Sequence, residues 1–160
     1  MMRPLLIPFL WCARRVARVF VSAALALLMT LGGPSVAQNA DANVQRWSEI
    51  NQETIRHFSE GNFAQAEDPA RRALRFAQFF LTDRPSDLAS SHFNLASVLY
   101  ELQDYAAAAE GHRQALAIRR DIDPPNLGEI ADSLSALAWA DYRQGAFRSA
   151  AQSFLEGADV

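Results

Sequence analysis

Apolar and turn residues recur along this chain with a period of 42 residues. The segment Gly61-Asn62-Phe63 returns as Gln103-Asp104-Tyr105 and as Gly145-Ala146-Phe147, and each time an alanine follows the aromatic residue three positions later. Other positions keep the same phase: Leu88/Ile130, Leu95/Leu137, Ala96/Ala138, Tyr100/Tyr142 and Ala73/Ala115. A fixed period of this length indicates stacked supersecondary units.

The pattern inside each unit is helical. Apolar residues recur at the spacing of a helix, and no alternating run of Val, Ile or Thr predicts a strand. We therefore predict an all-α chain of helical pairs, at 44–60 with 63–81, 87–102 with 105–122, and 127–144 with 147–158. Small residues are expected where the helices of a pair touch, and Tyr105 and Phe147 are expected to fill the gap to the preceding helix.

Local signals refine these helices. Asn126 followed by Glu129 resembles a capping box, and Ser86 is expected to cap the 87–102 helix in the same way. Pro69 lies more than one turn inside the 63–81 helix and removes a backbone hydrogen bond, so we expect a kink there. The arginines of the second helices are expected to lie on solvated faces near acidic residues; these are Arg71, Arg72, Arg75, Arg119 and Arg120.

Residues 1–37 have the order and proportions of a secretory signal peptide. Four arginines precede the apolar run 19–31, and Ser35-Val36-Ala37 supplies the small residues of a cleavage site. The run is short for a membrane span, which needs roughly 20 apolar residues. We therefore expect export to the periplasm or beyond, with membrane contact only in transit; retention by an uncleaved anchor is the alternative. Residues 38–46 are predicted to form a short polar leader.

Charge and cysteine content narrow the classes of partner. The only cysteine, Cys12, lies in the predicted signal peptide. The remaining chain has 11 arginines, no lysine and 18 acidic residues, so its net charge is −7 against −3 for the full chain. Binding to nucleic acid or to anionic lipid depends on a cationic surface. The composition therefore argues against both.

The units resemble tetratricopeptide repeats, which are helix-turn-helix units that stack into a right-handed α-solenoid. The resemblance is clearest over 94–116 and at Leu137-Ala138, Tyr142, Gly145, Phe147 and Ala150, and it is weaker in the first copy, where Glu53-Thr54 replaces Leu-Ala. The 42-residue length is similar to that of the kinesin light chain type. The export signal is similar to that of exported bacterial members. The resemblance implies repeats at 47–88, 89–130 and 131–160, the last one uncapped.

The resemblance also implies a concave groove formed by the first helix of each repeat. Trp139 and Tyr142 are expected to anchor a bound peptide or partner protein, because aromatic side chains bury large areas at low entropic cost. Asn94, Glu101 and Arg143 are expected to give polar recognition. The predicted partner-binding residues are Asn51, Ser90, Asn94, Ser97, Tyr100, Glu101, Trp139, Tyr142 and Arg143.

Comparison with binding modes of the family leaves the ligand open. Members that grip a C-terminal carboxylate use Lys, Arg and Asn on the inner face, and no cation occupies the matching positions here. The kinesin light chain type bonds a peptide backbone through an Asn that Asn94 matches, although Gln52 and Ala136 do not repeat it. The alternative is that Tyr100 and Tyr142 pack between repeats and that Trp139 rests against a missing neighbour.

Catalysis has little support in the sequence. The histidines His57, His92 and His112 fall on positions that normally pack, and no cysteine or close carboxylate completes a zinc-ligand set. No Gly-x-Ser-x-Gly motif or phosphate-binding loop occurs. We therefore expect no catalytic residue, no metal and no other cofactor.

The predicted function is that of a non-catalytic adaptor. Two alternatives arise from the residues at the C-terminal end of the chain. Repeat stacks normally need a polar cap, and the sixth helix ends the chain with Ala151, Phe154 and Leu155 as an apolar edge. The chain is then either the repeat module of a larger, peptidase-like effector or a structural subunit that forms homo-oligomers through this edge.

Overall fold

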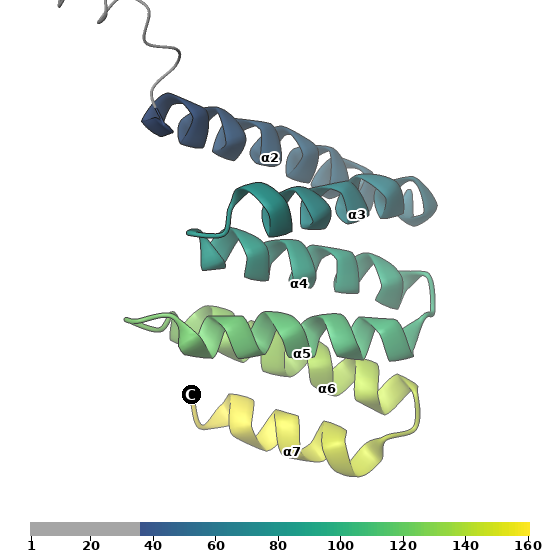
Figure 1. Ribbon diagram of the computed structural model, residues 1–160. Coiled ribbons are helices and arrows are strands. Elements are labelled where there is room, and N and C mark those ends of the chain that lie inside the picture. Colours follow the sequence, from purple (N-terminus) through teal and green to yellow (C-terminus); the bar gives the residue numbers. More distant parts are fainter. Residues whose placement is uncertain (1–35) are drawn as a thin grey trace, which may run out of the picture. The chain divides into compact units, whose positions relative to one another are not determined.

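The computed structural model describes residues 36–160, with side chains from Asn39 onward. Its helices are α2 (Val36–Ser59), α3 (Phe63–Phe80), α4 (Pro85–Glu101), α5 (Tyr105–Asp121), α6 (Leu127–Arg143) and α7 (Phe147–Ala158). They form antiparallel pairs that stack in chain order (Figure 1). Residues 40–160 make up one compact unit. The described residues contain no strand, which confirms the predicted all-α helix-turn-helix solenoid.

The start of α2 differs from the sequence prediction. The helix begins at Val36 instead of residue 44, so the predicted leader at 38–46 is helical. No glycine or proline follows Pro34 in this stretch, and three alanines favour the helix. The predicted signal peptide lies outside the described residues except for its last two positions. Within 36–160, no helix combines the length and the apolar character needed to cross a bilayer.

The tight turns inside the three pairs share one geometry. The turn residues have a positive φ, of 74° at Gly61, 67° at Gln103 and 88° at Gly145. In each turn, the N–H of the next residue donates to the carbonyl oxygen five positions back, at 2.8–2.9 Å. This is the Schellman arrangement, which satisfies carbonyl groups at a helix end and needs a left-handed residue. The three turns predicted from the repeat are therefore confirmed.

An aromatic pair braces each of these turns. The rings meet edge to face across the turn at 5.3 Å for Phe58 and Phe63, 5.4 Å for Tyr100 and Tyr105, and 5.4 Å for Tyr142 and Phe147. This geometry suits the quadrupoles of the rings. Tyr105 and Phe147 thus contact the preceding helix, as predicted, but Phe147 does not fill a gap, because it remains 63% exposed.

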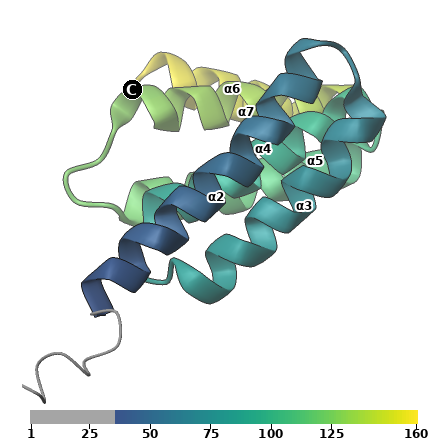
Figure 2. The same ribbon diagram turned by 90° about the horizontal axis from the view of Figure 1, so that it is seen from above.

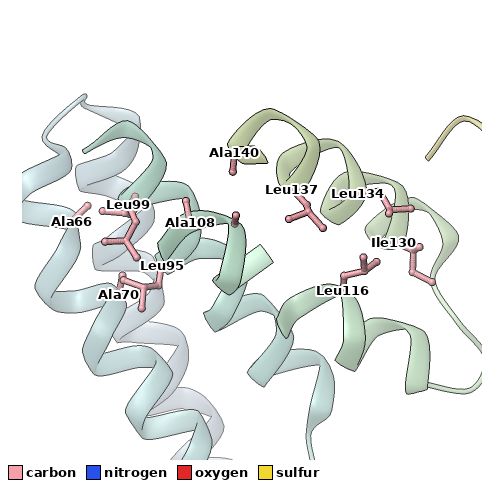
Figure 3. Packing of buried hydrophobic residues seen from close by; sticks show 12 residues of the cluster. Ala66, Ala70, Leu95, Leu99, Ala108, Leu116, Ile130, Leu134, Leu137 and Ala140 are labelled. Atoms are coloured by element: carbon pink, nitrogen blue, oxygen red, sulfur yellow. The ribbon is translucent and has the colours of Figure 1, made fainter. Parts of the chain in front are cut away.

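The core is built mainly from small residues. Ala66 and Ala70 of α3 lie next to Leu95 and Leu99 of α4 in Figure 3, and the apolar cluster continues from there into α6. Gly111 of α5 shows how closely the helices of a pair approach, because a Cβ atom there would lie 2.8 Å from the Cβ atom of Ala96. Burial of this apolar surface is the main stabilising contribution. As Figure 2 shows, successive pairs also turn about the stacking direction.

The helix starts follow the predicted caps in one case and not in another. Asn126 Oδ1 accepts a hydrogen bond from the Glu129 N–H at 3.3 Å, as predicted. Ser86 is not a cap, because α4 begins at Pro85, whose fixed φ and missing N–H suit the first helical position. The helix α3 continues through Pro69, which is buried.

One arginine differs from the prediction of solvated arginines. Arg119 is only 7% exposed, and its Nη1 donates to the Glu129 carbonyl oxygen at 2.9 Å and to Ser133 Oγ at 2.7 Å. Its Nε lies 3.1 Å from Glu129 Oε2, and its guanidinium carbon lies 4.8 Å from the centre of the Phe93 ring. Burial lowers the pKa of Arg119 although Glu129 and Asp132 oppose the shift. Arg119 therefore ties α5 to α6 across the loop between two pairs.

Candidate functional site

Two adjoining cavities lie along the first helices of the pairs, α2, α4 and α6. The larger, here the central cavity, has a volume of about 460 Å³ and is lined by Phe58, Ser97, Tyr100, Glu101, His112, Ala136 and Trp139. The smaller, here the side cavity, has a volume of about 160 Å³ and is lined by Thr54, Ile55, Phe58, Phe93, Asn94 and Ser97. The cavities share Phe58 and Ser97, so together they form one groove.

Of the two predicted anchors, only Trp139 lines the groove. Its side chain remains 51% exposed while its ring packs edge-on against Phe154 at 5.4 Å and Tyr142 at 6.1 Å. Trp139 is thus held from behind by α7 and still presents apolar surface to the central cavity. Tyr142 lines neither cavity, because its ring contacts Trp139 and Phe147 instead. Leu155, on the predicted C-terminal edge, is 70% exposed.

The amide groups of Asn51 and Asn94 form a polar pair beside the side cavity. Asn94 Nδ2 donates to Asn51 Oδ1 at 2.8 Å, which joins α2 to α4. One amide oxygen and one NH₂ group of this pair stay available to a ligand, since each amide can form several hydrogen bonds. Ser97 Oγ donates to the Phe93 carbonyl oxygen at 2.9 Å and keeps its acceptor capacity. Ser90 lines neither cavity.

The two charged residues predicted for the groove have different environments. Glu101 is exposed and is the one carboxylate among the described residues that line the central cavity. Within 36–160 it forms no ion pair. Arg143 instead donates to the Tyr105 hydroxyl, and its guanidinium carbon lies 4.4 Å from the centre of the Tyr105 ring and 5.8 Å from that of Tyr100. Hydrogen bonding to Tyr100 raises the pKa of Arg143. Arg143 therefore braces two repeats and is not a residue of the groove.

His112 lines the central cavity although it comes from a second helix. Its side chain is 2% exposed and its ring meets Phe93 edge to face at 5.0 Å. Burial, assisted by the charge of Arg119, lowers the pKa of His112 to about 4, so the ring is neutral at pH 7. Burial also lowers the pKa of His92. In the part of the chain that the structure describes, no three His, Cys, Asp or Glu side chains are placed to hold a metal ion.

Sequence reasoning missed Thr54, Phe58 and His112 as groove residues, whereas Ile55 and Phe93 lie on the inner face that it predicts. The 42-residue period could have identified Phe58, because it occupies in the first copy the position of Tyr100 in the second. Nothing in the period indicates His112, since the matching residues are Ala70 and Phe154. Its neighbour Gly111 lies where α5 approaches α4 closely enough to exclude a Cβ atom, at 2.8 Å from the Cβ atom of Ala96.

Comparison with known proteins finds a family match for the C-terminal part of the chain. Residues 87–160, which span α4 to α7, match the family model described as tetratricopeptide repeat. No curated protein and no solved structure matches this chain. Repeats of this family generally mediate protein–protein interaction and are typically non-catalytic. Residues 87–160 are therefore similar to tetratricopeptide repeats, in agreement with the helix-turn-helix stack.

Proposed function

We propose that this protein is a non-catalytic adaptor that binds an extended peptide segment of a partner protein in the groove. The observation that carries the proposal is the continuity of the central and side cavities along α2, α4 and α6. A mainly apolar concave lining with a few convergent polar groups is typical of a binding site.

The groove supplies both contacts that an extended segment needs. Phe58 and Trp139 offer apolar surface for a side chain of the segment, and Trp139 is backed by α7. The Asn51–Asn94 pair offers amide groups to the backbone of the segment. Asn94 corresponds to the backbone-binding Asn of the kinesin light chain type, and we propose that the 42-residue unit is of that type.

Selection from a displayed library of random peptides would test the groove. Peptides that bind wild type should lose at least about tenfold in affinity with Trp139→Ala, because a central aromatic anchor typically contributes more than 1.4 kcal/mol. Phe79→Ala is the matched control, since Phe79 on α3 is 75% exposed and lines neither cavity. Peptides that bind all three proteins equally would contradict the proposal.

We also propose that the protein works after export, in the periplasm or outside the cell. The support is the order of charged, apolar and small residues over 1–37. Mass spectrometry of the protein from a periplasmic fraction should find a chain that starts near Gln38. A full-length chain confined to the cytoplasm would contradict export and would leave the groove proposal unaffected.

A further inference from the structure

The central cavity combines aromatic side chains from three helices with a single carboxylate. Phe58 comes from α2, Tyr100 from α4 and Trp139 from α6, and Glu101 follows Tyr100 directly. Aromatic ring faces carry negative electrostatic potential and attract cations, and the attraction is strongest for Trp. A carboxylate beside such rings adds a charge of the sign that a cation requires. The lining therefore contains two kinds of group that attract a positive charge.

The charged groups that line the cavity also favour a cation. His112, at the floor, is neutral at pH 7 because burial lowers its pKa to about 4. Arg143 lines neither cavity; it is bound to Tyr105, and its guanidinium carbon lies 5.8 Å from the centre of the Tyr100 ring. Glu101 is thus the one charged lining residue at neutral pH among the described residues. Residues 40–160 carry 18 acidic residues against 11 arginines, which favours approach of a cationic segment.

The fold itself places guanidinium groups on aromatic rings. Arg119 lies 4.8 Å from the ring centre of Phe93, and Arg143 lies 4.4 Å from that of Tyr105. Both distances fall within the range of cation–π contacts, about 6 Å. Rings of the same repeats therefore already accept arginine where the chain supplies one, whereas no arginine of the described residues lines the central cavity.

We propose that the central cavity binds the cationic side chain of an arginine or lysine in the bound segment, between Phe58, Tyr100 and Trp139 and next to Glu101. The inference rests on the proposed function, because the segment is the one that occupies the groove. A peptide side chain is favoured over a free ammonium compound because the side cavity, with the Asn94 amide, continues the site toward the main chain on either side of that residue.

Peptide titration followed by NMR of the Trp139 indole N–H would test the proposal. The purified protein is titrated with three blocked heptapeptides that differ only in a central Arg, norleucine or Glu, and Trp139→Phe identifies the signal. The Arg peptide should bind at least about fivefold more tightly than the norleucine peptide, and the Glu peptide most weakly. Glu101→Gln should weaken only the Arg peptide, by about fivefold, whereas Asp121→Asn, at an exposed carboxylate of α5, should leave all affinities unchanged.

Several outcomes would overturn the proposal. Norleucine binding as tight as Arg binding, or Glu101→Gln without effect, would show an apolar pocket and leave the peptide groove intact. Tetramethylammonium ion that binds more tightly than the Arg peptide would assign the cavity to a small cation. If neither these peptides nor library-selected ones shift the Trp139 signal, the groove proposal itself fails. An Arg preference that weakens with added salt would support a charge-dependent site.

Discussion

At the scale of single residues, His112 makes the stability of the protein depend on pH. Its pKa is about 4 in the folded protein, against 6.5 for an ordinary histidine. Between these values the unfolded chain binds more protons, so stability falls as the pH drops from 6.5 to 4 and levels off below. From pH 7.5 to pH 5, His112 should account for a loss of about 2 kcal/mol in the free energy of unfolding.

Urea unfolding of wild type and His112→Leu at both pH values would measure this loss. The variant places an apolar side chain at this 2% exposed position and removes the titrating group. Its stability should therefore vary less over this pH window, by about 2 kcal/mol. His92, whose pKa is also lowered by burial, remains in both proteins and contributes equally to both curves. An identical pH dependence in the two proteins would show that His112 is not buried as a neutral group.

At the scale of helices, Gly111 sets the distance between α4 and α5. A Cβ atom at this position would lie 2.8 Å from the Cβ atom of Ala96, which is fully buried. Gly111→Ala should therefore destabilise the protein by about 1–3 kcal/mol through overpacking, although alanine is the better helix former.

The sign of this effect should reverse when the opposing methyl group is removed. In an Ala96→Gly background, the new Cβ atom keeps only ordinary contacts, at 3.5 Å from the Cα atom of residue 96 and from the His92 carbonyl oxygen, and Gly111→Ala gains about 1 kcal/mol from helix propensity. Chemical denaturation of the four proteins gives the coupling between the two positions. If Gly111→Ala destabilises both backgrounds by the same amount, the close contact with Ala96 does not determine the packing of this pair.

At the scale of the whole molecule, the repeat made the fold predictable and the site only partly so. Gly61 and Gly145 suggest tight turns by themselves. The 42-residue period predicts the same turn at Gln103, which adopts a positive φ although it is not glycine. The period also places Trp139 on the inner face. It cannot show which polar groups bind each other, so Arg143, predicted to meet a ligand, contacts Tyr105 instead.

Burial of charge is the other property that the sequence did not predict. Arg119 and Arg120 are neighbours with the same expected role, yet Arg119 is 7% exposed and Arg120 forms an exposed ion pair with Glu156. The difference arises because Arg119 faces the loop from α5 to α6, where a backbone carbonyl and Ser133 accept its hydrogen bonds. Such acceptors exist only once the third pair has docked.

Arg119 therefore allows a prediction about how stability is distributed over the stack. Arg119→Ala leaves Glu129 and Ser133 without their partner and should cost about 2–3 kcal/mol, whereas Arg71→Ala, which removes the exposed pair with Glu67, should cost at most about 0.5 kcal/mol. Each repeat contacts mainly its neighbours, so the loss should be local. Native-state hydrogen exchange should show α6 and α7 losing more protection than α2 and α3. An equal loss in all helices would instead mean that residues 40–160 unfold as one cooperative unit, and the Arg119 contact would then stabilise the whole stack and not only the docking of its third pair.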